Sequence, residues 1–373
     1  MTLPNPLKPG ERVAVGMSGG VDSTVAAAFL KRQGVDVFGL TMRIWAGPAG
    51  QPAAEKGCHG CYGPGEAEDI EQARAIAERL GIPHHTVDLT EPYAREVIGP
   101  FRGEYGRGRT PNPCVICNSR MKFGFLLDKA REQGLAFDAF ATGHYARIRF
   151  DEVRCRYGLL KAVDPKKDQS YFLARLTQDQ LSRTLFPLGE LTKPEVKRWA
   201  AELGFADVAD KPESQDFVDG GDYTALFEGC ALSPGPIQDE AGHVLGQHRG
   251  LPYYTIGQRK GLGLSGTADP LFVIRIDAER NALVVGPKAA LYSDRLTAQQ
   301  VNWIAVDRLE APCRARVKIR QQHAEAAAEL RPVSPFDPSR VDVIFDQPQM
   351  SIAPGQTVVF YEDDSVLGGG VIA

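Results

Sequence analysis

One short segment near the N-terminus constrains the fold of this chain more than any other. Residues 13–16 alternate valine with a small residue as a strand does, residues 18–20 read Ser-Gly-Gly, and residues 23–30 suit a helix. Two glycines between a strand and a helix let the backbone approach an anion closely. The free N–H groups at the start of the helix would then face that anion. The segment therefore predicts an anion-binding turn at one end of a sheet.

Three side chains of this turn suit a phosphate ligand. Ser18 and Ser23 add hydroxyl donors, and Asp22 adds a carboxylate that could hold Mg²⁺. The turn is neither a Walker loop, which needs Gly-Lys-Ser/Thr, nor a dinucleotide-binding turn with Gly-x-Gly-x-x-Gly. An ordinary glycine-rich connection between a strand and a helix is the alternative. The hydroxyls, the acid and the flanking pattern together favour a phosphate site.

Ser-Gly-Gly-Val-Asp-Ser at residues 18–23 resembles the PP-loop of ATP pyrophosphatases. Those enzymes cleave ATP between the α and β phosphates and leave AMP on a carbonyl oxygen. The resemblance implies ATP and Mg²⁺ as cofactors, with Mg²⁺ on Asp22. It assigns the nucleotide to Gly16, Met17, Ser18, Gly19, Gly20, Val21, Asp22 and Ser23, and further to Met42 and Gly143. For Met42, core packing at the end of a strand is the alternative.

Length and composition set limits on the class of protein. The 373 residues are enough for two or three domains with well-formed cores. The net charge of −4 gives no overall sign of a nucleic-acid binder, so any such role must rest on local basic patches. We see no secretory signal and no window near the ~18 apolar residues that span a bilayer. We therefore expect a cytoplasmic protein without membrane contact.

Strands and helices alternate in the first half of the chain. The pattern predicts strands over 35–44, 84–89 and 137–142, and helices over 66–80, 123–133 and 193–203. This alternation implies a parallel sheet covered on both faces, with ligands at the C-terminal strand ends. From residue 271 on, short alternating runs separated by turn residues predict an antiparallel β-barrel. We expect an α/β PP-loop domain over 1–210, a small central domain over 211–288 and the barrel over 289–373.

The cysteines indicate chemistry rather than cross-linking. There are seven, an odd number, which argues against a disulfide framework. Four of them form two Cys-x-x-Cys pairs, Cys58/Cys61 and Cys114/Cys117. That spacing suits metal, cluster or sulfur chemistry.

The second pair lies in the segment 108–118, where prolines flank Asn112 on both sides. Two such prolines predict an extended, loop-like backbone. Nearby positive charge lowers the pKa of a thiol, so we expect a low-pKa thiolate here. The candidate cations are Arg107, Arg109, Arg120 and Lys122. A zinc knuckle or a packed pair of buried thiols is the alternative.

Seven motifs in order carry a more specific resemblance. Gly-Met-Ser-Gly-Gly-Val-Asp-Ser (16–23), Gly-Arg-Thr-Pro-Asn-Pro-Cys-x-x-Cys-Asn (108–118), Ala-Thr-Gly-His-Tyr-Ala (141–146) and Lys-Lys-Asp-Gln-Ser-Tyr-Phe-Leu (166–173) come first. Thr-Ile-Gly-Gln-Arg-Lys-Gly-Leu (255–262), Ala-Pro-Gly-Gln (353–356) and Leu-Gly-Gly-Gly (367–370) follow. Together they resemble the tRNA-specific 2-thiouridylase family and span nearly the whole chain.

The resemblance implies a reaction. ATP adenylates the C2 carbonyl oxygen of the wobble uridine in a tRNA anticodon, and a sulfur nucleophile then displaces AMP to leave 2-thiouridine. An ionised sulfur is a strong nucleophile at neutral pH. The family's nucleophile matches Cys117, with Cys114 as its partner. The sulfur would come from a donor protein or from inorganic sulfide.

The chain departs from the family pattern at one place. Many members carry a second, persulfide-bearing cysteine shortly after Glu-Ser-Gln-Asp, whereas residues 213–219 here read Glu-Ser-Gln-Asp-Phe-Val-Asp. The next cysteine, Cys230, has a different local context. An alternative is a [4Fe-4S] cluster on Cys61, Cys114 and Cys117, with Cys58 as a further candidate, whose open iron would bind hydrosulfide. Packing or zinc binding by Cys58 and Cys61 is the remaining option.

Further residues match the family's RNA-contacting positions. They are Asn112, Pro113, Cys114, His144, Lys167, Asp168, Gln169, Arg320, Gln321 and Gln356. A satisfied loop histidine is the alternative for His144, and a helix N-terminus with solvated charges is the alternative for residues 167–169. Independently, residues 314–320 alternate cations with apolar residues, which puts four positive side chains on one face of a strand. Such a face suits a phosphate backbone, although a solvated surface is the alternative. Two rival functions are a PP-loop synthetase acting on a small molecule and a non-catalytic metal-binding RNA module.

Overall fold

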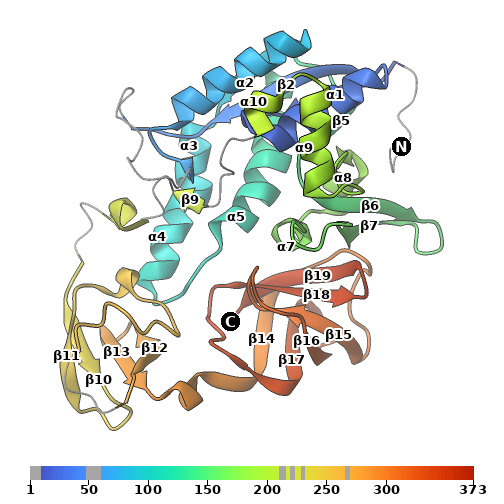
Figure 1. The fold of residues 1–373 in the computed structure, drawn as a ribbon. Coiled ribbons are helices and arrows are strands. Elements are labelled where there is room, and N and C mark those ends of the chain that lie inside the picture. Colours follow the sequence, from blue (N-terminus) through green and yellow to red (C-terminus); the bar gives the residue numbers. More distant parts are fainter. Residues whose placement is uncertain (1–9, 48–59, 210–215, 219–222, 228–231, 265–268) are drawn as a thin grey trace.

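The computed structural model describes residues 10–47, 60–209, 216–218, 223–227, 232–264 and 269–373. Three larger sheets organise the described chain: a parallel one in the N-terminal part, a small one in the middle and a barrel at the C-terminus. In Figure 1 the parallel sheet and its helices lie above, with the central sheet and the barrel side by side below. The predicted fold class is confirmed. None of the helices within the described residues has the length and apolar character that crossing a bilayer requires.

The N-terminal sheet is parallel throughout. Its order is β4 (His84–Asp88), β2 (Asp36–Arg43), β1 (Arg12–Gly16), β5 (Ala139–Thr142) and β8 (Thr184–Leu185). The strand β1 is buried on both faces: Val13 and Val15 pack into one core, and Ala14 into the other. Because β2 extends the sheet from one side of β1 and β5 from the other, the strand order reverses there.

Helices cover both faces of this sheet, as the alternating pattern predicts. The helices α1 (Val21–Arg32), α2 (Glu66–Leu80) and α9 (Lys193–Glu202) share one core with Val13 and Val15. The opposite core contains residues of α4 (Gly99–Gly106), α6 (Leu126–Glu132) and the π-helical segments η1 (Ala94–Ile98) and η2 (Cys117–Phe125). Short helices complete this part: α3 (Thr90–Tyr93), α5 (Pro113–Ile116), α7 (Ser170–Leu173), α8 (Gln178–Ser182) and α10 (Ala206–Ala209).

The cysteine-bearing segment is helical where a loop was expected. Asn112 has the extended backbone that its prolines predict, but it caps α5, and its side chain accepts a hydrogen bond from the Val115 N–H. Pro113 occupies the first turn of α5, a position that tolerates the missing N–H. From Cys117 the chain continues as η2 into α6, so the helix expected over 123–133 is part of a longer helical run. Wide helical turns of this kind occur often at functional sites.

Antiparallel pairs predominate in the central sheet and the barrel. The central sheet consists of β10 (Gly235–Gln238), β11 (Val244–His248), β12 (Phe272–Asp277) and β13 (Ala282–Gly286), although β10 and β13 pair in parallel. The barrel consists of β14 (Tyr292–Trp303), β15 (Cys313–Lys318), β16 (Ala326–Ser334), β17 (Asp337–Met350), β18 (Thr357–Glu362) and β19 (Ser365–Ile372), and β19 pairs with β14 to close it. Single 3₁₀ turns are η3 (Tyr223–Phe227), η4 (Leu251–Tyr253) and η5 (Lys288–Leu291).

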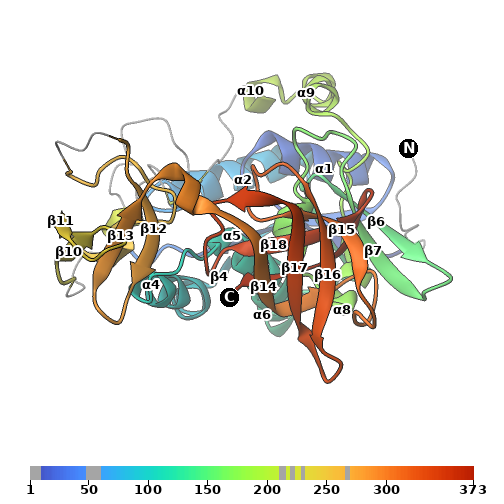
Figure 2. The same cartoon turned by 90° about the horizontal axis from the view of Figure 1, so that it is seen from below.

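Two strand pairings cross the expected domain boundaries, which remain predictions. The hairpin of β6 (Ala146–Asp151) and β7 (Arg156–Lys161) follows β5 in the chain but joins the barrel sheet, where Leu160 of β7 pairs with Ser365 of β19. Figures 1 and 2 both show this hairpin against the barrel. Short β3 (Gly60–Tyr62) pairs in parallel with β9 (Asp216–Val218). Residues far apart in sequence therefore tie the N-terminal part to the rest.

Arg156 fastens the hairpin to the barrel. Its guanidinium donates to the carbonyl oxygens of Ile304 (3.0 Å) and Trp303 (3.4 Å) and pairs with Asp307, while its side chain is 17% exposed. Arg154 on the same hairpin is 49% exposed and lies 3.9 Å from Asp151. Arg156 is therefore the one of these two arginines whose loss would remove a charged donor from the Trp303 and Ile304 carbonyl groups, although Ile304 keeps a hydrogen bond from Gln178.

Replacing Arg156 with alanine is expected to lower the free energy of unfolding by about 1–3 kcal/mol, because buried acceptors lose a charged donor. Amide hydrogen exchange should rise in β7 and in residues 303–307. Arg154→Ala is the matched control and should change neither quantity. Equal effects of the two substitutions would contradict the assignment of Arg156 as the fastening residue.

Candidate functional site

A cavity of about 310 Å³ opens at the point where the strand order reverses. Ligands of open parallel sheets bind at this position. Nine residues of the predicted nucleotide site line it: Gly16, Met17, Ser18, Gly20, Val21, Asp22, Ser23, Met42 and Gly143. The tenth, Gly19, has a φ of +74°, a conformation that favours glycine, and a Cβ there would lie 3.0 Å from the Asp69 carbonyl oxygen.

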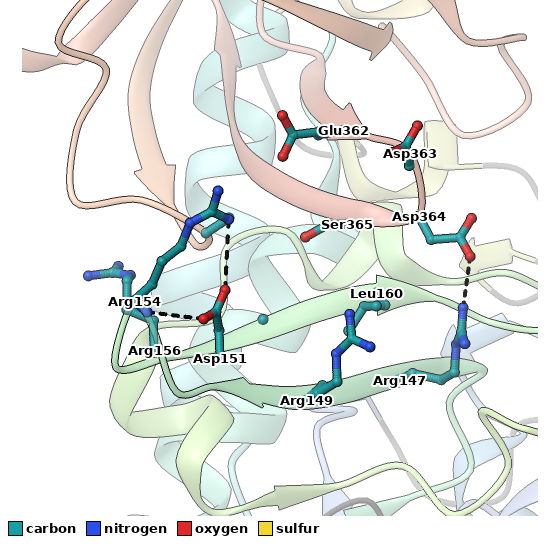
Figure 3. Close-up of a pocket in the computed structure, with 12 residues that line it drawn as sticks. Arg147, Arg149, Asp151, Arg154, Arg156, Leu160, Glu362, Asp363, Asp364 and Ser365 are labelled. Carbon is teal, nitrogen blue, oxygen red and sulfur yellow. Dashed lines mark hydrogen bonds and ion pairs between the residues drawn. The ribbon is translucent and has the colours of Figure 1, made fainter.

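A second groove, of about 560 Å³, runs between the β6–β7 hairpin and the turn that joins β18 to β19 (Figure 3). Its charged lining is balanced: the hairpin supplies Arg147, Arg149, Asp151, Arg154 and Arg156, and the turn opposite supplies Glu362, Asp363 and Asp364. Arg147 already pairs with Asp364 at 3.0 Å, as Figure 3 shows. A groove with this charge balance does not favour an anion, so the cavity beside β1 is the candidate active site.

The turn after β1 has the form of an anion site. The N-cap of α1 is Gly20, which has no side chain to cap the helix. The N–H groups of the first turn are therefore not capped by Gly20, and this turn lines the cavity. The Ser23 hydroxyl donates to the Gly20 carbonyl oxygen (3.1 Å) and accepts from the Ser18 N–H (3.2 Å), which holds the turn in shape. The helix dipole and the N–H groups there favour a phosphate.

Gly143 has a packing reason to be glycine. A Cβ at this position would lie 2.7 Å from the Asp22 carbonyl carbon and from the Ser23 nitrogen. The end of β5 therefore touches the first turn of α1, and both line the cavity. The expectation that Gly143 lets the nucleotide approach is compatible with this contact, but the structure adds a reason that sequence reasoning missed.

Asp22 is held by two residues that sequence reasoning also missed. The Lys193 Nζ donates to both Asp22 oxygens at 2.8 Å, and the Tyr145 hydroxyl donates to Oδ1 at 2.7 Å. In the sequence, Lys193 is marked only by the capping box at the start of α9, and Tyr145 only by its place next to His144. Mg²⁺ needs free carboxylate oxygens, and here an ammonium group occupies both. The expected direct Mg²⁺ site on Asp22 does not fit this arrangement.

His144 faces the same cavity in its neutral form. Its Nδ1 lies 2.7 Å from the Thr142 hydroxyl, and the rings of Phe123 and Phe186 pack beside it. Burial lowers the pKa of His144 well below its ordinary value. A neutral imidazole can donate or accept a hydrogen bond with a ligand without adding charge. Its predicted contact with RNA stays a prediction.

Glu66, at the start of α2, is a further cavity residue that the sequence did not indicate. Its carboxylate accepts hydrogen bonds from the Ile44 and Trp45 N–H groups, and burial raises its pKa. Asp69 lies one helical turn further on and also lines the cavity. Lys122 from η2 is the cation among the described lining residues. The negatively charged residues in the described lining are therefore Asp22, Glu66 and Asp69, against the one cation Lys122.

Cys61 and Cys117 differ sharply in exposure. Cys61, on β3, is exposed and lines the cavity. Cys117 is 8% exposed, and burial raises its pKa to about 11 although Lys122 and a hydrogen bond with Tyr93 favour the thiolate. The expectation of a low-pKa thiolate is wrong for Cys117 in this state, because desolvation outweighs the nearby charge.

The cations expected beside the thiols are paired elsewhere. Arg107 and Arg109 both contact Glu104, at 3.1 and 2.7 Å, and Arg120 contacts Glu96. Lys122 is the member of the predicted set that acts on Cys117. Glu104 lies close to Arg107 and Arg109 in the sequence, whereas Glu96 lies 24 residues from Arg120, so that pairing depends on the fold.

Cys61, Cys114 and Cys117 all act electrostatically on the buried Tyr93 hydroxyl, so the fold gathers them in one region. Even so, no group of three or more histidine, cysteine or acidic side chains within the described residues is arranged to hold a metal ion. Cys58 and Cys230 lie outside the described residues, as do residues 213–215. None of the five described cysteines forms a disulfide.

The residues expected to contact RNA converge between the N-terminal part and the barrel. The Asn112 amide donates to the Gln356 Oε1 at 3.1 Å, and the Gln321 amide donates to the Asp168 carbonyl oxygen at 3.0 Å. The Asp168 carboxylate itself accepts from Ala162 and Ser170, which leaves it a local structural role. A direct contact of Asp168 with RNA stays a prediction.

Three more of these residues have individual positions. Gln169 lines the nucleotide cavity and accepts the Tyr145 N–H at 2.9 Å. Lys167 is half-buried, and Arg320 donates to the Met350 carbonyl oxygen at 3.2 Å. On β15 the predicted alternation is confirmed, since Ala315 and Val317 are buried in the barrel while the intervening cations face outward. Of these cations, Arg314 pairs with Asp346, which reduces the charge available for a phosphate.

The fold and the cavity define a class: a parallel-sheet domain with an anion-binding turn at its switch point, followed by two β domains. Family models match the same succession, as a tRNA methyl transferase HUP domain over residues 11–218, a tRNA methyl transferase PRC-barrel domain over 226–287 and an aminomethyltransferase beta-barrel domain over 271–372. Within this class, the chain belongs to the tRNA-specific 2-thiouridylase (MnmA) family, as its relatives show.

The relatives cover nearly the full chain. The tRNA-specific 2-thiouridylase MnmA of Endomicrobium trichonymphae is 49% identical over 97% of this chain and 98% of its own. Those of Heliobacterium modesticaldum and Acetivibrio thermocellus are 48% and 45% identical over 97% of this chain and over 92% and 99% of their own. A solved 4-thiouridine synthetase in complex with RNA is 17% identical, with a TM-score of 0.33 over 56% of this chain and 44% of that one, too low for any argument.

Alkylation tests the burial of Cys117. A rise in pKa from 9.0 to about 11 lowers the thiolate fraction at neutral pH about 100-fold, so iodoacetamide should modify Cys117 far more slowly than the exposed Cys61. The rate at Cys117 should climb steadily with pH toward about 11. Peptide mass spectrometry reads each site separately, with the exposed Cys155 as the control. Modification of Cys117 before Cys61 at neutral pH would contradict the burial argument.

Proposed function

We propose that this protein uses ATP to replace the C2 oxygen of the wobble uridine in tRNA with sulfur, in the cytoplasm, where such tRNA is found. The observation that carries the proposal is one cavity lined both by an anion-binding turn and by a cysteine. The turn spans residues 18–23, and Cys61 opens into the same space, with Cys117 packed close by. Phosphate binding and sulfur chemistry in a single cavity suit adenylation followed by thiolation.

The activation half of the reaction follows from the turn. The open first turn of α1 suits the β and γ phosphates of ATP. The uridine O2 attacks the α phosphorus, the bond between the α phosphorus and the bridging oxygen breaks, and pyrophosphate leaves with the electron pair. Fixed N–H groups accelerate such a transfer because they orient the phosphates and stabilise the developing negative charge, without forming a covalent bond to the protein. Mg²⁺ would accompany the nucleotide phosphates and supply charge neutralisation.

In the second half of the proposed reaction, Cys117 transfers the sulfur and Cys114 assists it. In this route a donor protein, or sulfide with an oxidant, loads a persulfide on Cys117. The terminal sulfur attacks C2, and AMP leaves with the former uridine oxygen. The Cys114 thiolate then attacks the Cys117 Sγ, which releases the 2-thiouridine and leaves a disulfide between the two cysteines. An external dithiol reductant restores both thiols.

An alternative for the sulfur step is a [4Fe-4S] cluster on Cys61, Cys114 and Cys117 that binds hydrosulfide. The grouping of these three cysteines around Tyr93 favours it. Among the residues that the structure describes, no group of three or more histidine, cysteine or acidic side chains is arranged to hold a metal ion. Cys58, outside the described residues, is a further ligand candidate under this alternative.

The names of the relatives and of the family models point to different transfers. Two of the models carry a methyl transferase name, whereas the full-length relatives are named thiouridylases. Cys61 in the cavity lining, with Cys114 and Cys117 acting on the same buried Tyr93 as Cys61, favours sulfur over a methyl group. For RNA, the convergence of Asn112, Gln356 and Gln321 between the N-terminal part and the barrel supports a binding surface for the anticodon arm. Single-stranded loops are read by splayed bases, so we expect the uridine to flip toward Cys117.

Serine substitutions separate the two halves of the reaction. Cys117→Ser should lower 2-thiouridine formation at least 100-fold but keep tRNA-dependent release of one equivalent of pyrophosphate per site, because adenylation needs no thiol. Cys155→Ser, at the exposed tip of the β6–β7 hairpin, is the matched control and should retain both activities. Full thiolation by Cys117→Ser would refute the assigned nucleophile. Pyrophosphate release driven by a small carboxylate without tRNA would favour a small-molecule synthetase.

Iron analysis separates the two sulfur routes. After anaerobic purification, the persulfide route predicts full thiolation with a persulfide donor and no bound iron. The cluster alternative predicts about four iron and four sulfide per chain, lost in Cys61→Ala together with activity. An active, iron-free protein that is indifferent to Cys61→Ala would eliminate the cluster.

A further inference from the structure

We propose that Lys193 contacts the leaving pyrophosphate and supplies the positive charge that this phosphate-binding turn lacks. The proposal rests on the proposed ATP cleavage. In a Walker loop a lysine within the loop reaches the phosphates, but residues 16–23 contain no lysine or arginine. The fold instead brings Lys193, from the first turn of α9, to within 2.8 Å of Asp22 in the turn. The missing charge therefore arrives from 171 residues further along the chain.

The position of Lys193 is strongly fixed. The capping box of Thr192 and Glu195 starts α9 at this residue, and the Lys193 N–H donates to the buried Asp164 carboxylate at 3.0 Å. The Lys193 side chain is 9% exposed. Holding an ammonium group away from water is costly unless it has a purpose or a partner, and its partner here belongs to the phosphate-binding turn itself.

The charge of the cavity requires such a cation. Among the described residues that line it, the acids are Asp22, Glu66 and Asp69, and the cation is Lys122. Without a further cation, a bound nucleoside triphosphate would lie against a lining with two more negative than positive charges. Lys193 compensates the acid that lies nearest to the anion-binding turn. Potentials of this kind over a partly enclosed site decide whether a polyanion binds.

Asp22 then has a different role from the one expected of it. Both of its oxygens hold the Lys193 ammonium, and the Tyr145 hydroxyl binds one of them as well. Asp22 is therefore a positioning residue that aims the ammonium at the turn. As the bond to the α phosphorus breaks, negative charge grows on the pyrophosphate. The flexible lysine stem can follow that charge, while Tyr145 keeps a hydrogen bond to Asp22.

Binding measurements with Lys193→Gln test the proposal. Pyrophosphate and ATP affinities, measured by calorimetry with and without Mg²⁺, should fall at least 10-fold, whereas AMP affinity should change less than 2-fold. Lys193→Arg should recover part of the loss. Lys197→Gln, an exposed lysine on the same helix, is the matched control and should bind all three ligands as the unaltered protein does. An unchanged pyrophosphate affinity, or an equal loss for AMP and pyrophosphate, would overturn the role of Lys193.

Asp22→Asn keeps the test decisive if Lys193→Gln does not fold. Removing the acid frees the ammonium, so pyrophosphate affinity without Mg²⁺ should hold or rise. If Asp22 served as a Mg²⁺ ligand instead, affinity would fall only when Mg²⁺ is present, and that result would overturn the proposal. Failure of the unaltered protein to bind ATP or pyrophosphate at all would refute the proposed function as well as this inference.

Discussion

The close approach of β5 to the turn after β1 is the contact on which the rest of the site depends. Gly143 has no side chain, so the end of β5 reaches the backbone of Asp22 and Ser23. This contact brings the segment after β5 to the phosphate-binding turn, and Tyr145 in that segment binds Asp22. Lys193 reaches the same carboxylate from α9. Three separate stretches of chain thus meet at one carboxylate, and the cavity opens beside them.

Much of the fold could be predicted because it follows from local periodicity. The alternation of Val13, Ala14 and Val15 reflects a strand that is buried on both faces, and the turn residues after residue 271 reflect an antiparallel barrel. The hairpin of β6 and β7 escaped prediction, since its partner β19 lies about 200 residues further along the chain. The helical form of residues 113–125 also escaped, because prolines at 111 and 113 suggest an extended segment, yet a proline at the first turn is tolerated.

For the cysteines, the sequence predicted where they gather, but it did not predict the pKa of Cys117. Their spacing predicted one region for sulfur chemistry, which stays a prediction, and the fold places Cys61, Cys114 and Cys117 near enough to Tyr93 to raise its pKa. The charge argument failed because Arg109 and Arg120 are paired with Glu104 and Glu96, and because burial of Cys117 raises its pKa. Neither burial nor the direction in which a helical arginine points is written in a short sequence motif. A thiol that is protonated and enclosed in this state needs its surroundings to change before it can act.

The sequence by itself determined the class of fold and predicted the anion-binding turn and the cysteine site, since each depends on residues close together in the chain. Tertiary structure alone decided which groups share the cavity. Glu66 lines the cavity from α2, and Lys193 reaches the cavity residue Asp22 from α9, although neither helix sequence indicates a ligand. The cation on Asp22 is the clearest case: a carboxylate beside a phosphate site suggests Mg²⁺ from sequence, but packing places a lysine on it, and electrostatics depends on distance in space rather than along the chain.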